Sequence, residues 1–354
     1  MCHGKSALTW LTYGTHVRAI VSTAANIHRA VFGRYDDLLA AHKPPLSTPY
    51  RHPAVLEQCA LILSNLVGPL HELGDQVPEE LRLPRLPGGN SEPFSFDSSS
   101  VRLDENIPVW LQNQRLYLEM TYHSMAINLY RPFISFYRRG AGSGALYRYL
   151  PTTDRHAARA ARHAITFVRI VHKVVHNTTL LAPTWNEYFQ WLWNAVVTLV
   201  GFLFAHPLHP TTTAAREAAE CAVSVCDIYA ASRFTVAADA ATILRCFLKR
   251  VDELFARVVA GVPAETGLSS DSTTPTLPSV SGETLLLEAH SEGSIDVVSS
   301  DMAIDDPTLS WLDPQQPGNP ESLNLFMDWA LAVDSFNNFD QLLGPSMEWD
   351  AFRW

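Results

Sequence analysis

The stretch LDENIPVWLQNQRLYLEMTYHSMAINLYRPFISF, Leu103 to Phe136, decides the fold class of this chain. Pro108 can begin a helix, because proline presets the backbone angle of the first turn, where its missing N–H is not needed. The apolar residues that follow recur at helical spacing and predict one buried stripe. The members of this stripe are Leu111, Leu118, Tyr122, Met125 and Leu129. Arg131-Pro132 ends the helix, and Phe133 anchors the exit.

Residues on either side of this helix repeat the same helical periodicity, and no run alternates apolar and polar residues as a strand would. A loop is predicted only at Leu81 to Leu103, where prolines, glycines and serines gather. Thr153 and Asp154 are expected caps, and Thr184 with Glu187 predicts a capping box. The fold class is therefore all-α. The further predicted helices are Leu8–Arg34, Pro53–Leu73, Arg155–His176, Trp185–Ala205, Ala214–Ser232 and Thr235–Val259.

The composition changes beyond Gly261, and this change divides the chain. Residues 263–354 hold 16 acidic residues and one basic residue, a net charge of −15, whereas residues 1–262 hold 20 acidic and 25 basic residues, a net charge of +5. The Ser/Thr/Pro/Gly segment that opens the second part cannot bury enough apolar area to offset its chain entropy. We expect a helical domain over 1–262 and a largely disordered acidic tail over 263–354.

The apolar run Tyr188 to Ala205 is the best candidate for a membrane span. It is only just long enough, contains Gln190, Asn194 and Thr198, and has no flanking Lys or Arg, so a buried core helix is favoured. The five cysteines form no CxxC pair and are odd in number. They indicate ordinary thiols in a reducing compartment rather than a disulfide framework.

Motifs for catalysis are scarce: GxSxG, GxGxxG, P-loop and HExxH patterns are all missing. The pair Asp36-Asp37 lacks the later acidic residue of a prenyl-diphosphate metal motif and predicts a solvated helix face. His172 and His176 could share one side of a helix, but no third metal ligand lies near them in sequence. We therefore expect no enzyme activity and no cofactor; an all-α enzyme of terpene-synthase type and a structural or membrane-associated helical protein are the alternatives.

The richest basic stretch lies in the predicted helix that begins at Arg155. Arg155, Arg159 and Arg162 share one helical face, but the whole chain has only four lysines and no long basic run. Nucleic-acid binding needs a denser basic surface with an element that enters a groove. A solvated face able to pair with the acidic tail is favoured over a DNA-reading helix.

Leu103 to Phe136 also resembles the middle homology region of fungal zinc binuclear cluster transcription factors. In that family a P-x-W-L-x-x-Q-R-x-x-L helix runs into Y-H-x-x-x-I-x-L-x-R-P-F, and a looser similarity continues here to about Val259. The resemblance implies a regulatory domain, truncated at its N-terminal side, in a nuclear regulator. The matching residues are Pro108, Trp110, Leu111, Gln114, Arg115, Leu118, Tyr122, His123, Ile127, Leu129, Arg131, Pro132 and Phe133.

The family's DNA-reading part has no counterpart here. Its members carry an N-terminal cluster of six cysteines that binds two zinc ions, and this chain contains no CxxC. Zinc is therefore expected only in that missing cluster, and direct DNA binding by this chain is not expected.

The last residues, 326–354, combine seven aromatic rings with five carboxylates and a single arginine. This acidic-aromatic segment is typical of a disordered activation segment that recruits transcriptional coactivators. Contact between the tail and the helical domain is the second predicted interaction, since Trp329, Val333 and Phe336 would form one helical stripe. The activation residues are Phe326, Asp328, Trp329, Phe336, Phe339, Asp340, Leu342, Leu343, Trp349, Phe352 and Trp354, with Asp334, Glu348 and Asp350 as the further carboxylates.

Overall fold

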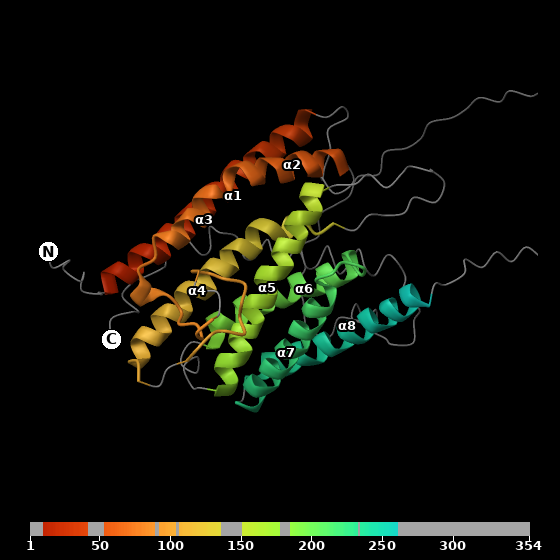
Figure 1. The fold of residues 1–354 in the computed structure, drawn as a ribbon. Helices are drawn as coiled ribbons and strands as arrows, with labels where there is room; N and C mark the ends of the chain where they lie inside the picture. Colours follow the sequence, from red (N-terminus) through yellow and green to blue (C-terminus); the bar gives the residue numbers. More distant parts are fainter. Residues whose placement is uncertain are drawn as a thin grey trace, which may run out of the picture.

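A computed structural model describes residues 10–41, 53–88, 92–103, 106–135, 151–177, 185–232 and 234–260. Within these ranges the chain is helical, and the one β-bridge joins Arg85 to Val101 (Figure 1). The all-α prediction is confirmed. The α-helices are α1 (Trp10–Ala41), α2 (Pro53–Leu66), α3 (Gly68–Asp75), α4 (Val109–Tyr130), α5 (Pro151–Asn177), α6 (Trp185–Ala205), α7 (Thr212–Ala231) and α8 (Thr235–Val259), and the 3-10 helices are η2 (Glu79–Leu81) and η3 (Arg131–Phe133).

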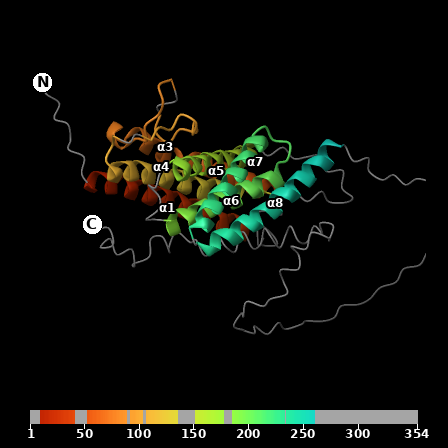
Figure 2. The same ribbon diagram turned by 90° about the horizontal axis from the view of Figure 1, so that it is seen from below.

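Helix α5 lies at the centre of the molecule. It packs against α4, α6, α7 and α2, whereas α1 packs on α4 and α8 packs mainly on α7. Figures 1 and 2 show α1 to α3 on one side of the molecule and α8 at the opposite side. The core is continuous from α1 through α4, α5 and α6 to α7.

The helix predicted from the opening stretch is present, and its ends are close to those predicted. α4 begins after Pro108, and Arg131-Pro132 ends it by starting η3, whose Phe133 is 1% exposed. The predicted single stripe was too narrow, because almost every side chain from Leu116 to Tyr130 is buried. The reason is that α1, α5, α6 and η2 pack around α4, so little of its second half reaches water, with Asn128 partly exposed.

The stretch Pro53 to Leu73 was predicted as one helix and is two. α2 ends at Leu66 and α3 begins at Gly68, with Pro69 in the first turn of α3. Proline removes one backbone donor and clashes with the preceding turn, which breaks a continuous helix. In contrast, α1 continues to Ala41, beyond the predicted end, and carries Asp36 and Asp37 on its exposed face.

The start of α5 differs from the prediction. The helix begins at Pro151, so Thr153 and Asp154 lie inside its first turn and are not its caps. The cap comes from α2: the Glu57 carboxylate accepts hydrogen bonds from the backbone N–H groups of Thr152 at 2.9 Å and Thr153 at 3.0 Å, and from the Thr153 hydroxyl at 2.7 Å. A distant carboxylate thus satisfies donors that every helix start leaves open.

The apolar run Tyr188 to Ala205 is long and apolar enough to cross a membrane, but 78% of it is buried inside the fold. α6 packs against α4, α5, α7 and α8, which makes it a core helix here. Pro53 to Asp75 passes the same composition test with 33% buried, although Val67 interrupts its helix. The predicted capping box at Thr184 and Glu187 and the tail 263–354 lie outside the described residues and side chains.

Candidate functional site

The residues of the sequence signature divide into an exposed and a buried group along α4. Trp110 is 45% exposed and Pro108 is also exposed, whereas Leu111 and Arg115 are half-buried. The Arg115 Nε atom donates to the Glu80 carbonyl oxygen at 2.7 Å, which ties the start of α4 to η2. The buried signature residues are Gln114, Leu118, Tyr122, His123, Ile127, Leu129 and Phe133, with Arg131 and Pro132 half-buried in η3.

A buried ion pair lies beside the signature residue His123. Arg85 approaches from the loop that precedes α4, and its NH2 group is 2.5 Å from a Glu119 oxygen on α4. The two side chains are only 5% and 3% exposed. Arg85 also donates to the Asp97 carbonyl oxygen, so one guanidinium joins both sides of the loop to α4.

The ion pair continues into a pair of buried histidines. The same Glu119 oxygen is 3.6 Å from Nε2 of His123, and Nδ1 of His123 is 2.9 Å from Nδ1 of His163 on α5. One Nδ1 must donate and the other accept. A hydrogen on Nε2 of His123, facing Glu119, assigns the donating hydrogen to Nδ1 of His163. Burial, followed by the neighbouring His123, His71, Arg162 and Arg159, lowers the pKa of His163 well below its usual value, so the ring is neutral.

Two phenylalanines hold the loop against this network. The Phe94 ring stacks on Tyr122 with centroids 4.0 Å apart, and the Phe96 ring lies 4.6 Å from His163. Phe94 adopts a positive φ of 56°, an unusual angle for a side chain of this size. Its ring also fills the space beside Gly74, where an added Cβ would approach the ring to 3.3 Å. The loop is therefore fixed by packing at several points.

Tyr130 extends the network to the start of α5. Its ring is stacked on His163 with centroids 5.8 Å apart, and its hydroxyl contacts His71 at 3.2 Å and an Arg159 nitrogen at 3.3 Å. His156 lies one turn before Arg159 on α5, and its Nε2 atom is 2.9 Å from the Ala60 carbonyl oxygen. Burial lowers the pKa of His156 to about 4, so this ring is also neutral near pH 7.

The network is suited to fixing the alignment of the helices around it. Arg85 and Glu119 match in charge and the rings pack on one another, although Nε2 of His123 and Nδ1 of His156 are buried without a hydrogen-bond partner in the part of the chain that the structure describes. Within the described ranges, no three His, Cys, Asp or Glu side chains are placed to hold a metal ion. His172 and His176 stack with centroids 4.0 Å apart. The His176 ring is bonded through Nδ1 to the His172 carbonyl oxygen and through Nε2 to the Ser224 hydroxyl on α7.

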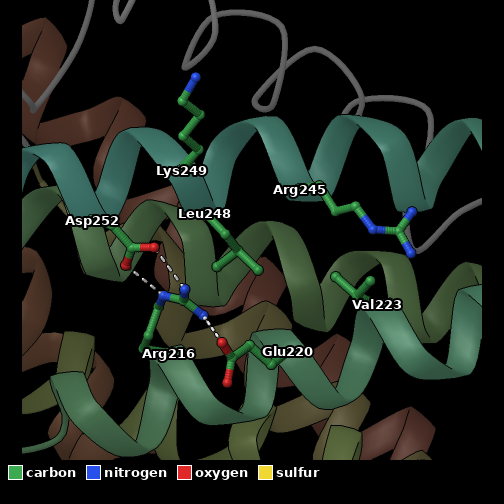
Figure 3. A pocket seen from close by; sticks show the side chains of 7 residues that line it. All are labelled: Arg216, Glu220, Val223, Arg245, Leu248, Lys249 and Asp252. Atoms are coloured by element: carbon green, nitrogen blue, oxygen red, sulfur yellow. Dashed lines mark hydrogen bonds and ion pairs between the residues drawn. The ribbon is translucent and has the colours of Figure 1, made fainter.

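A second polar surface lies between α7 and α8, where a groove of about 460 Å³ opens to solvent (Figure 3). Arg216 of α7 binds both Asp252 oxygens at 2.8 Å and one Glu220 oxygen at 2.7 Å. The hydrogen bonds that Arg216 donates to Asp252, opposed by partial burial, raise the pKa of Arg216. The groove is lined by charged side chains around the apolar Val223 and Leu248, so it is a solvated interface between two helices, here called the α7–α8 seam. The lining residues are Arg216, Glu220, Val223, Arg245, Leu248, Lys249 and Asp252.

Sequence reasoning identified α4 but missed most of this network. Arg85, Phe94 and Phe96 lie in a stretch that was predicted only as a loop. No role was predicted for Glu119 or His163. Two signals were available: His156 and His163 are seven residues apart and so share a helix face, and two phenylalanines stand in a serine-rich loop. The thiols differ in exposure, with Cys59 and Cys226 buried, Cys221 intermediate and Cys246 exposed. The predicted activation residues all lie outside the described residues.

Curated proteins match the chain over a large part of its length. It is 30% identical over 251 residues to the terreic acid cluster-specific transcription factor atF of Aspergillus terreus, which covers 69% of this chain and 36% of that protein. It is 33% identical over 257 residues to the transcription factor asqA of Emericella nidulans, covering 72% of this chain and 43% of that protein. The chain therefore spans less than half the length of either relative.

A shorter alignment, 27% identical over 111 residues, relates the chain to the oosporein cluster regulator OpS3 of Beauveria bassiana. It covers 30% of this chain and 13% of that protein. No protein-family model and no solved structure matches the chain. The similarity to fungal transcription regulators, first suggested by the residues of α4, is confirmed at the level of the family.

Proposed function

The chain belongs to a family of fungal transcription factors, and from this premise we propose that it controls a specific set of genes through a helical regulatory domain and an acidic activation segment. The observation that supports the proposal is the pair of alignments, each of which covers more than two thirds of this chain. The described part of the chain is a helical domain whose polar network is built for packing. Regulation rather than catalysis is consistent with both.

The regulated genes are proposed from the names of the relatives. Two of them are described as specific for, or regulators of, the terreic acid and oosporein clusters. We infer that this chain likewise acts on a group of genes for one biosynthetic pathway. Its place of action would be the nucleus, and zinc would belong to a DNA-binding cluster of the family that none of these residues provides.

Activation is assigned to the acidic-aromatic segment, residues 326–354. Five carboxylates interspersed with seven aromatic rings keep the rings in water, and the rings supply anchors for a coactivator groove. The partner would therefore be the transcriptional coactivator machinery. Binding by a segment that orders on contact has reduced affinity but accommodates several partners.

A tethered reporter assay tests this function. Residues 263–354 are fused to a heterologous DNA-binding domain, beside a matched fusion in which Phe326, Trp329, Phe336 and Phe339 are changed to Ala. The proposal expects strong activation by the first fusion and its loss in the second at equal protein level. Inactivity of both fusions would remove the activation role. A control fusion changes the nearby polar residues Asn337 and Asn338 to Ala, which should leave activation unchanged.

A further inference from the structure

Helix α5 carries a row of basic side chains along one face, here called the α5 basic row. Successive members are four, three, seven and four residues apart, which places them within one narrow stripe of the helix. Arg155 and Arg162 are exposed, and the other three are partly exposed. The members are Arg155, Arg159, Arg162, Arg169 and Lys173.

Most contacts of the row are with neutral groups. Arg159 donates to the Tyr130 hydroxyl, the Arg162 guanidinium lies over the Phe96 ring at 4.1 Å, and Lys173 donates to the carbonyls of Ser99 and Val101. Of the ion pairs formed among the described residues, one involves the row: Arg169 with Glu217 at 2.9 Å, with 36% and 59% of their side chains exposed. Five positive charges thus meet one carboxylate in this part of the chain.

Two other carboxylates beside α5, those of Glu57 and Asp97, bind neutral groups and not the row. Glu57 binds the first turn of the helix through Thr152 and Thr153, and Asp97 accepts hydrogen bonds from Ser99 and the backbone of Ser100. The row is therefore a surface of net positive charge, in contrast to the α7–α8 groove, where arginines and carboxylates alternate. Such a surface attracts anionic partners.

The contacts of the row also leave N–H groups of its arginines able to bind carboxylates. The guanidinium carbon of Arg162 lies over the Phe96 ring, and a guanidinium held against a ring in this way can still offer N–H groups to carboxylates. Arginine can then receive a carboxylate through two parallel hydrogen bonds. The face of α5 is suited to a peptide that presents several carboxylates.

We propose that the α5 basic row is the docking surface for the acidic-aromatic segment of the same chain, residues 326–354. That segment carries five carboxylates against one arginine, which complements the charge of the row. Residues 261–325 connect it to the end of α8, and a random coil of that length, 65 residues, would span about 45 Å.

Tethering favours this partner over a separate anion such as a nucleic-acid backbone. A connection of this length holds the segment at a high effective concentration near the row, so that weak contacts are sufficient. Salt weakens contacts between exposed charges, so the docked form would be released as ionic strength rises. If the proposed function is correct, docking would also hide the aromatic anchors from a coactivator. The docking contact itself does not depend on the proposed function.

Zero-length cross-linking of the full chain tests the contact. Arg155→Lys with Arg162→Lys keeps both charges and places two amines on the row, which a carbodiimide joins to a touching carboxylate with loss of water. The matched control, Arg18→Lys with Arg34→Lys, places two amines on the exposed face of α1. Mass spectrometry of the monomer should find links from positions 155 and 162 to carboxylates of residues 326–354 several-fold more often than links from positions 18 and 34. The number of these links should fall at about 0.5 M salt, which strongly screens contacts between exposed charges.

Equal linking from both helices, or no link from α5 to the segment, would overturn the proposal. A charge reversal tests whether the row holds the segment. Arg155→Glu with Arg162→Glu should raise reporter activation by a tethered full chain several-fold, whereas the control Arg18→Glu with Arg34→Glu should leave it unchanged. If instead the α5 reversal abolishes binding to random double-stranded DNA and no links form, the row is a phosphate surface and the proposed partner is wrong. If residues 263–354 alone fail to activate while the links form, docking stands and the activation role fails.

Discussion

Two helix interfaces of this molecule use the same residue types in opposite surroundings. Between α4 and α5, Arg85 and Glu119 form an ion pair that is almost wholly buried, and the buried His123 and His163 continue it. Between α7 and α8, Arg216 and Asp252 form a bidentate pair with 20% and 52% of their side chains exposed. Water around the second pair screens its attraction, whereas removal of one partner from the first leaves a buried charge.

The comparison indicates where the sequence constrains the fold. Residues of the family signature, including Tyr122 and His123, surround the buried pair, so this part of the molecule depends on particular side chains. At the α7–α8 seam the apolar side chains among the charges are Val223 and Leu248. Substitutions of the same chemical kind should therefore have unequal effects at the two interfaces.

The largest effect is expected from Arg85→Ala. The change leaves Glu119 buried beside His123 without its cation, and breaking a buried pair in this way costs about 3–5 kcal/mol of unfolding free energy. Urea unfolding of the full chain measures it. Arg18→Ala on the exposed face of α1 is the control, with a change below about 0.5 kcal/mol, and Arg85→Lys should lie between. Equal losses for Arg85→Ala and Arg18→Ala would contradict the importance of the buried pair.

The next effect concerns acid. Burial lowers the pKa of His156 to about 4 in the folded chain, below its ordinary value of 6.5. The unfolded chain therefore binds a proton more readily, and this part of the stability is complete above pH 6.5 and lost as the pH falls from 6.5 towards 4. The loss is about 3 kcal/mol at most, from 1.36 kcal/mol per pKa unit. His156→Asn should flatten the dependence of unfolding free energy on pH in this window; an unchanged slope would assign acid sensitivity to other groups.

A smaller effect is expected at the start of α5. Glu57→Ala removes the carboxylate that caps Thr152 and Thr153, and loss of a helix cap costs about 0.5–2 kcal/mol. Burial alone would raise the pKa of Glu57, but hydrogen bonds from Thr152 and Thr153 outweigh it and lower the pKa. The contribution is therefore present above the unfolded pKa and lost as the pH falls below it. Thermal unfolding at pH 7 and pH 3 should separate the variant from the parent chain only at pH 7.

The smallest effect is expected at the α7–α8 seam. Asp252→Asn weakens the bond with Arg216, but exposed ion pairs contribute about 0.2–1 kcal/mol and less at high salt. Urea unfolding at low and high salt measures the difference between this variant and the parent. A loss as large as that for Arg85→Ala would show that the seam, and not the buried pair, holds the helices together.

Local signals in the sequence were sufficient for much of the fold. Pro108 and Arg131-Pro132 placed both ends of α4, and the apolar spacing of α8 gave its bounds. The break at Val67 was missed although Pro69 was visible, because the apolar stripe continues across it. In these places the deciding interaction lies within a few residues.

The network around α4 could not be predicted in the same way. Arg85 and Glu119 are 34 residues apart, and Glu57 and Thr152 are 95 apart. Each pairing depends on how the helices meet, which no local pattern encodes. The caps predicted at Thr153 and Asp154 were wrong for this reason, since a carboxylate from α2 replaces a local cap.

Paired double-mutant cycles test most directly whether burial of charge distinguishes the two interfaces. One cycle combines Arg85→Ala with Glu119→Ala, and the other combines Arg216→Ala with Asp252→Ala, all in the full chain and measured by urea unfolding. The buried pair should give a coupling free energy several times larger than that of the exposed pair, which should be about 1 kcal/mol or less. Equal coupling energies for the two pairs would contradict the account.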